Sequence, residues 1–204
     1  PPAAPIVFIG GGNMARSLIA GLVARGGDAA SVRVVDPNAD SRDALARDFG
    51  VRTFADAAQA VDGAATWVLA TKPQVLRGVC ESLADVAQAT QPLVLSIAAG
   101  ITATQLDRWL GGDVPVVRTM PNTPALLGAG VTGLFANARV DDAGRARAQA
   151  LLESAGETVW IDDEARMDAV TAVSGSGPAY IFLLAEAMEE AAIAQGLPAD
   201  DART

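Results

Sequence analysis

The chain of 204 residues contains no histidine and only one cysteine, Cys80. Without histidine, the Ser–His and Cys–His nucleophilic pairs and histidine-based zinc sites are excluded. Any proton transfer must therefore use carboxylates, lysine, tyrosine, hydroxyls or water. A single cysteine forms no internal disulfide, which is typical of a reducing compartment and favours a cytoplasmic location. Because no histidine can activate Cys80, we interpret it as a buried structural thiol.

Long apolar runs and positive charge are also scarce. No run of eighteen apolar residues occurs, which argues against a membrane span. The segment Pro1–Pro5 lacks the basic start and apolar body of a signal peptide and is interpreted as a short tail. The net charge of -9 argues against nucleic acid and anionic membranes as partners. Half of the residues are hydrophobic, so a large core can form.

Apolar runs alternate with helical patterns along most of the chain. Such alternation predicts an α/β fold with a doubly wound, Rossmann-type, mostly parallel sheet. We expect a dinucleotide-binding domain over residues 1–161 and the first part of an all-α domain over residues 162–204. Strands are predicted at 6–9, 32–35, 51–53, 65–70, 93–97, 114–118, 130–136 and 157–161, with 130–136 at the sheet edge.

The segment 178–195 is apolar nearly all round. A helix of this kind must be buried on every side. The residues before it can cover one face, so the other face needs further chain or a second subunit. We therefore expect a homodimer or a higher homo-oligomer formed through these helices.

A glycine turn follows the first predicted strand and opens a helix: Gly10, Gly11, Gly12, Asn13, Met14 and Ala15. Gly10 permits a tight turn, Gly12 allows close approach of a pyrophosphate, and Ala15 lets the helix pack on the strand. Asp36 ends the second strand, where an acid contacts the ribose of NAD. Arg42 is either a partner for the 2′-phosphate of NADP or a surface charge. The choice between NAD and NADP thus stays open.

Three more segments follow predicted parallel strands and meet at the ligand-binding edge of the sheet. Their small or polar residues are expected to border the cofactor: Ala70, Thr71, Lys72, Pro73, Ala98, Ala99 and Asn122. Close helix–sheet packing explains the alanines equally well.

The stretch Ser174–Pro178 precedes the apolar helix. It either holds an anion on serine hydroxyls and free N–H groups or caps the helix beside a close glycine contact. Asp162, Asp163 and Glu164 suggest helix-dipole complements rather than ligands, so no metal is expected.

The motifs GGGNMA (10–15), TKPQ (71–74), SIAAG (96–100), MPNTP (120–124) and SGSGPAY (174–180) occur in order. Together they resemble the pyrroline-5-carboxylate reductases. The resemblance implies hydride transfer from NADPH or NADH to the C=N carbon of 1-pyrroline-5-carboxylate, giving L-proline. It also implies a dimerisation role for the C-terminal helices. The reaction needs hydride delivery and a protonated imine, so the lack of histidine is compatible with it.

The family resemblance leaves the catalytic proton donor unassigned. Candidate substrate contacts are Glu164, Ser174, Gly175 and Ser176. Family members continue through further helices with a Gly/Thr-rich loop, so we expect a truncated chain that binds cofactor without completing turnover. Two alternatives are a β-hydroxyacid-dehydrogenase-like oxidoreductase and a non-catalytic dinucleotide-binding module.

Overall fold

The computed structural model describes residues 4–204, so part of the predicted N-terminal tail lies outside the described residues. Within this range the strands form one eight-stranded sheet in the order β3-β2-β1-β4-β5-β6-β7-β8. The strands are β1 (Ile6–Ile9), β2 (Val32–Val35), β3 (Arg52–Phe54), β4 (Thr66–Leu69), β5 (Leu93–Ser96), β6 (Val116–Met120), β7 (Gly130–Ala136) and β8 (Gly156–Trp160). The predicted doubly wound, mostly parallel sheet is confirmed.

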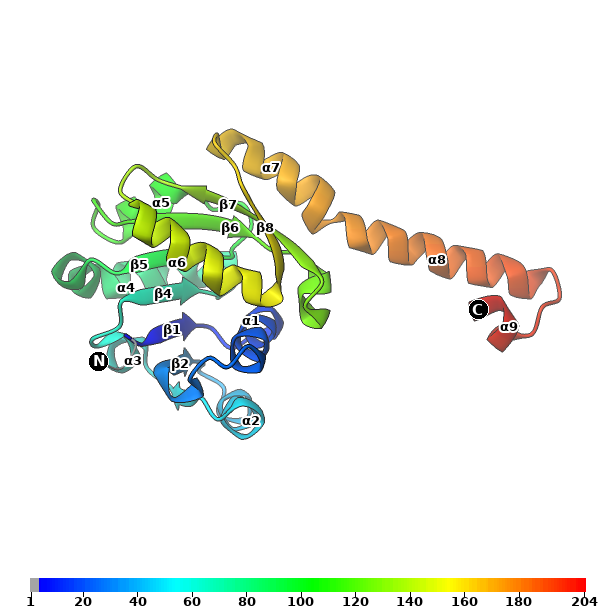
Figure 1. The fold of residues 1–204 in the computed structure, drawn as a ribbon, viewed down its shortest axis with the longest axis horizontal. Helices are drawn as coiled ribbons and strands as arrows, with labels where there is room; N and C mark the ends of the chain where they lie inside the picture. The colour runs from blue at the N-terminus through cyan, green and yellow to red at the C-terminus, as the bar shows by residue number, and fades with distance from the viewer. Residues whose placement is uncertain (1–3) are drawn as a thin grey trace.

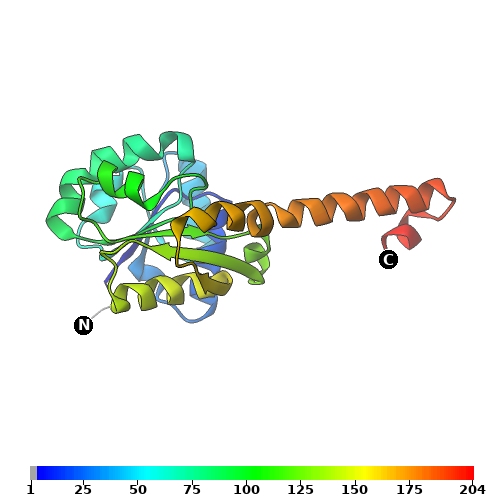
Figure 2. The same cartoon turned by 90° about the horizontal axis from the view of Figure 1, so that it is seen from above.

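Helices cover both faces of the sheet (Figures 1 and 2). They are α1 (Asn13–Ala24), α2 (Ala39–Phe49), α3 (Ala57–Val61), α4 (Pro73–Thr90), α5 (Ala103–Trp109), α6 (Asp142–Leu152), α7 (Met167–Val170), α8 (Gly177–Ala194) and α9 (Ala199–Arg203). Alternate residues of the strands point to opposite faces of the sheet and form two hydrophobic cores. Phe8 and Val117 pack with α1, α2 and α6, whereas Trp67 and Val116 pack with α3, α4 and α5.

The far end of the sheet differs from the prediction. β7 pairs antiparallel with β6 and parallel with β8, so β8 forms the edge and the expectation that 130–136 lies at the edge is wrong. The chain returns through α6 and places β8 outside β7. Gly156 permits this pairing because its φ is +143° and a side chain there would collide with Gly130.

The segment before the apolar helix is itself helical. After α7, the chain enters a π-helical turn, η5 (Thr171–Gly175), and passes directly into α8. Ser176 lies in the α-helical region at φ -92°, and no side chain caps α8. α8 begins where the helix was expected and the close glycine contact is present at Gly175, but the expected side-chain cap is absent from this segment. The N–H of Ser176 donates to the carbonyl of Thr171, so this segment is not a free helix N-terminus.

Helix α8 extends away from the sheet and its helices, and α9 folds back beside it (Figure 1). In the single chain its large apolar side chains are exposed, including Tyr180, Ile181, Phe182, Leu183, Leu184, Met188 and Ile193. Within residues 4–204, no helix has the length and apolar character needed to cross a membrane.

Cys80 lies on α4 and is completely buried. Its burial raises the pKa of the thiol to about 12, with the neighbouring charge of Glu81 acting in the same direction. At neutral pH the thiol is therefore protonated and a poor nucleophile. The prediction of a structural cysteine is confirmed.

Candidate functional site

The order of the strands reverses between β1 and β4, and the glycine turn lies at this switch point. The N–H group of Gly10 donates to the carbonyl oxygen of Val35, 2.8 Å away, at the end of β2. Gly10 has φ +110°, and a side chain there would come within 2.6 Å of the carbonyl oxygen of Ala70 after β4. Glycine is thus required where the turn passes closest to β4. Ligands of open parallel sheets bind at such a point.

Gly12 precedes the first turn of α1 and leaves it open. Among the residues that the structure describes, no side chain caps this helix, and a side chain built at Gly12 would meet nothing within 4 Å. The uncapped N–H groups at the start of α1 and the positive end of its dipole therefore face accessible space. Behind them, Ala15 is 1% exposed and packs in the core. A dinucleotide pyrophosphate fits this arrangement of donors without displacing a side chain.

Asp36 lies beside the same turn. One carboxylate oxygen accepts from the N–H of Gly11 at 3.1 Å and the other from the N–H of Asn38 at 2.9 Å. Arg42 donates from Nη1 to the carbonyl oxygens of Asp36 and Pro37 at 2.8 and 3.0 Å. An acid and a guanidinium thus meet at the end of β2, where the adenosine ribose of a dinucleotide is expected.

The segment after β4 reaches the switch point from the other side. Lys72 is exposed and precedes Pro73, the first residue of α4, which has no side-chain cap. Among residues 4–204, the buried hydroxyl oxygen of Thr71 has no hydrogen-bond partner. A buried hydroxyl without a partner is unusual and is satisfied when a ligand supplies one.

The two alanines after β5 differ in exposure. Ala98 is 4% exposed and packs in the core beneath α4 and α5, while its N–H donates to the hydroxyl of Ser96 at 3.3 Å. Ala99 is exposed. Of this pair, Ala99 is the residue that a ligand can reach, and Ala98 supports it from below.

Asn122 follows β6 and connects the sheet with the helical part. Its Oδ1 accepts from the N–H of Val131 at 2.9 Å, and its Nδ2 donates to the hydroxyl oxygen of Ser174 at 3.4 Å. Gly175 packs so closely that a side chain there would come within 2.7 Å of Met120. The hydroxyl of Ser176 is used within the π turn, where it donates to the carbonyl of Thr171. Ser174 is therefore the serine that contacts the β6 end.

Glu164 contacts a residue that the sequence reasoning missed. Arg118 on β6 is buried, and its guanidinium lies 3.4 Å from Glu164 and 3.0 Å from Asp168. Glu164 also accepts from the N–H of Ala103 at 2.6 Å. The available signal was a single charged residue in the otherwise uncharged strand segment VVRTM (116–120). Among residues 4–204, no group of three or more potential metal ligands gathers.

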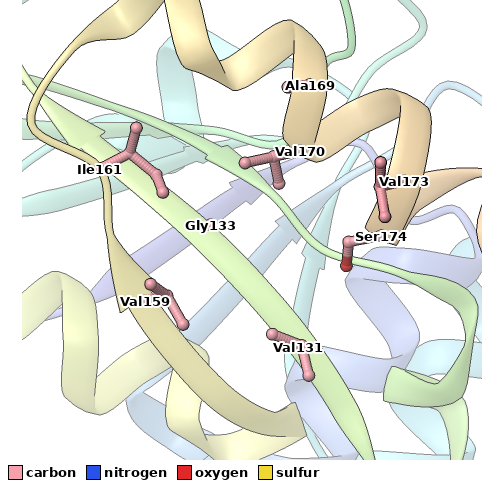
Figure 3. A pocket seen from close by; sticks show the side chains of 8 residues that line it. All are labelled: Val131, Gly133, Val159, Ile161, Ala169, Val170, Val173 and Ser174. Atoms are coloured by element: carbon pink, nitrogen blue, oxygen red, sulfur yellow. The ribbon is translucent and has the colours of Figure 1, made fainter.

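A separate apolar pocket of about 330 Å³ lies between β7, β8 and the α7–η5 segment (Figure 3). Aliphatic side chains surround it, and Ser174 at its rim supplies the polar side chain. Its lining residues are Val131, Gly133, Val159, Ile161, Ala169, Val170, Val173 and Ser174. None of the residues of the glycine turn lines it, so it is distinct from the proposed pyrophosphate cradle.

Comparison with known proteins decides the family. Residues 5–100 match the family model "NADP oxidoreductase coenzyme F420-dependent", and residues 164–204 match "Pyrroline-5-carboxylate reductase dimerisation". The pyrroline-5-carboxylate reductase of Pseudomonas aeruginosa is 51% identical over 97% of this chain and 72% of its own length. The chain belongs to the pyrroline-5-carboxylate reductase family. This result confirms the predicted resemblance and does not favour the β-hydroxyacid-dehydrogenase alternative.

Solved structures of the pyrroline-5-carboxylate reductase family agree with the fold. The Coxiella burnetii reductase is 42% identical, with a TM-score of 0.92 over 98% of this chain and 74% of that protein. The Plasmodium falciparum reductase, solved with NADP bound, has a TM-score of 0.87 over 98% of this chain and 73% of that protein. At 24% identity, this second likeness supports the fold alone.

Proposed function

We propose that this chain reduces 1-pyrroline-5-carboxylate to L-proline with NADPH or NADH. The observation that carries the proposal is the glycine turn at the β1–β4 switch point, which leads into the uncapped N-terminus of α1. The chain is also 51% identical to a named reductase. The bound dinucleotide supplies the hydride that adds to the C=N carbon of the substrate. The protein contributes binding, orientation and exclusion of water.

The proposed cofactor-binding residues contact different parts of the dinucleotide along the cleft. The N–H groups at the start of α1 hold the pyrophosphate beside Gly12. Asp36 and Arg42 face the adenosine ribose and together decide between NAD and NADP. Thr71 offers its unpartnered hydroxyl, and Ala99 and Asn122 border the nicotinamide end. The full predicted cofactor set is Gly10, Gly11, Gly12, Asn13, Met14, Ala15, Asp36, Ala70, Thr71, Lys72, Pro73, Ala98, Ala99 and Asn122.

Ser174 is the substrate contact that the geometry favours most. The N–H of Val131 points at Oδ1 of Asn122, so the amide of Asn122 must turn its NH₂ group toward Ser174. The oxygen of Ser174 then accepts, and its own hydrogen is free to donate to a third group. A substrate carboxylate or a water that delivers the proton to the imine nitrogen suits this donor. Gly175 supports Ser174 by its close packing, and Ser176 holds the π turn together.

The helical part is proposed to join two copies of the chain. Residues 164–204 match a dimerisation model, and the large apolar side chains of α8 are exposed in the single chain. We place the boundary between the dinucleotide-binding domain and this helical part at residues 161 and 162. A cytoplasmic location and the absence of nucleic-acid partners belong to the same proposal, supported by the buried thiol and the net charge of -9.

A spectrophotometric assay tests this function. The protein, in the full length that its gene encodes, is mixed with NADPH or NADH and either 1-pyrroline-5-carboxylate or a panel of β-hydroxyacids with the oxidised cofactor. We expect cofactor oxidation only with the imine. Absence of turnover with the imine, or turnover with a hydroxyacid instead, contradicts the proposal.

A further inference from the structure

Arg118 is a buried cation in the middle of strand β6. Its side chain is 5% exposed, against 21% for Glu164 and 83% for Asp168. Removing a charge from water is strongly unfavourable unless partners compensate it. Glu164 is the more buried partner, and Asp168 closes the pair at the solvent side. The energy of this site therefore depends mainly on Arg118 and Glu164.

The same pair joins four elements. Arg118 lies on β6, and Glu164 begins the short helical turn η4 (Glu164–Arg166) that leads into α7. Asp168 lies on α7 itself, and Glu164 also accepts from the N–H of Ala103, the first residue of α5. Moving η4 and α7 relative to the sheet would thus break the hydrogen bond between Ala103 and Glu164. It would also leave the guanidinium of Arg118 without its acidic partners.

Helix α7 has little freedom to move independently of η5. Its first residue, Met167, is fully buried, and Val170 lies so close to β7 that a side chain at Gly133 would come within 2.8 Å of it. The helix continues directly into the π turn that carries Ser174 and Gly175. π-helical turns are often found at functional sites. The position of the Ser174 hydroxyl therefore follows the position of α7.

We propose that Arg118 and Glu164 are positioning residues that fix η5 so that Ser174 meets Asn122 at the end of β6. This inference rests on the proposed function. Neither residue contacts the glycine turn, so the pair acts on the substrate side of the cleft and leaves dinucleotide binding unchanged. Glu164 accordingly serves the reaction through Arg118 and α5 rather than through contact with the substrate.

The test compares Arg118→Met, Arg118→Lys and Glu164→Gln in the full-length protein. Glu164→Gln keeps the shape of the side chain and an oxygen for the N–H of Ala103 but removes its charge. We expect Arg118→Met to lower kcat/KM for the imine by about tenfold or more, because a misplaced catalytic geometry is costly. The Kd for NADP⁺ stays within about twofold, and hydrogen exchange of residues 171–175 becomes faster. Arg118→Lys restores part of the activity, since lysine keeps the charge but not the fork of donors.

Arg139→Met serves as the matched control. Arg139 pairs with Asp113 at an exposed position outside this network, so its loss is expected to change neither kcat/KM nor exchange of residues 171–175. The proposal is overturned if Arg118→Met and Glu164→Gln keep both wild-type kcat/KM and wild-type exchange, or if they weaken NADP⁺ binding as strongly as catalysis. If Arg118→Met does not fold, Glu164→Gln decides. Failure of the wild-type protein to reduce the imine counts against the proposed function alone, because exchange still reports the positioning.

Discussion

Positions 10 and 12 lie in the same turn, and each is occupied by glycine for a different reason. Gly10 needs a positive φ and the absence of a side chain, because the turn presses against the carbonyl of Ala70. Gly12 has φ -69°, which any residue adopts, and open space in front of it. Folding therefore explains the first glycine, whereas the second has no folding reason in this structure. Close approach of a bound pyrophosphate to the backbone would instead explain why Gly12 lacks a side chain.

This difference predicts that one alanine substitution weakens dinucleotide binding and the other lowers the stability of the fold. Gly12→Ala is expected to leave the unfolding free energy nearly unchanged but to weaken NADP⁺ and NAD⁺ binding by about tenfold, a loss of about 1.4 kcal/mol. Gly10→Ala is expected to destabilise the fold by about 1–3 kcal/mol because of backbone strain. Denaturant unfolding and dinucleotide titration measure the two effects. Unaltered binding by a folded Gly12→Ala protein would contradict the pyrophosphate assignment.

Asp36 gives a second prediction at the scale of single residues. Its carboxylate repels a 2′-phosphate, so Asp36→Ala is expected to raise affinity for NADPH relative to NADH by about tenfold or more. Loss of the hydrogen bond to Gly11 also loosens the turn, which affects both cofactors alike. The ratio of the two Kd values, measured by titration, separates these effects.

Asp36→Asn is the matched variant, because the amide oxygen can still accept from the N–H of Gly11. It is expected to change the ratio in the same direction as Asp36→Ala while keeping absolute affinities closer to those of the wild type. An unchanged ratio in both variants would mean that the carboxylate does not face the ribose.

At the scale of elements, the period of the apolar residues predicted the parallel strands and their crossover helices well. Buried runs such as Ile6–Ile9 and Leu93–Ser96 have few alternative structures once flanked by turns and amphipathic helices. The position of β8 outside β7 was not predictable in this way. Strand order depends on which edge remains free after α6 has packed, and that is a tertiary property.

The candidate site was predictable where the backbone itself forms it. The glycine turn, Asp36 and the segment from Ala70 meet as expected, because strand ends of a parallel sheet share one edge. Sequence reasoning missed Arg118, because the burial of a charged side chain and its acidic partners are not apparent from the sequence. It left open whether Ala98 borders a ligand or packs in the core, and the structure shows packing. It also expected the segment 174–177 to precede a new helix starting at Pro178, because glycine and proline there usually mark a boundary. In the structure the chain instead passes from α7 through the π turn into α8, and this segment packs closely on the sheet at Gly133 and Gly175.

Helix α8 yields a prediction about assembly. Burying each large apolar side chain contributes about 1.5–3 kcal/mol, so its exposed apolar surface strongly favours association. We expect light scattering to show no stable monomer for the wild type. Leu184→Glu, which changes a side chain exposed in the single chain, is expected to shift the mass toward the monomer without unfolding it.

Glu190→Gln on the same helix is the control and should leave the mass unchanged, because Glu190 is already polar and exposed. A wild-type protein that remains monomeric at micromolar concentration would contradict the role of α8. Association that Leu184→Glu leaves intact would place the interface elsewhere.

At the scale of the whole molecule, the sheet with its two helical layers and the projecting α8 are separate in space (Figures 1 and 2). The proposed pyrophosphate cradle lies entirely within the sheet and its helices, at the ends of β1, β2 and β4. The end of β6 meets η5 at Asn122 and Ser174, where the helical part begins. In our account this junction receives the substrate, so hydride passes from the sheet side of the cleft toward the helical side.

Transfer of a labelled hydride tests this account most directly. The full-length protein is supplied with 1-pyrroline-5-carboxylate and NADPH or NADH carrying deuterium at the transferred position, and the product is analysed by mass spectrometry. The account predicts L-proline with a single deuterium on the carbon of the former C=N bond, and loss of this product in a folded Gly12→Ala protein at limiting cofactor. Unlabelled proline, or no proline from a protein that binds the dinucleotide, would contradict it.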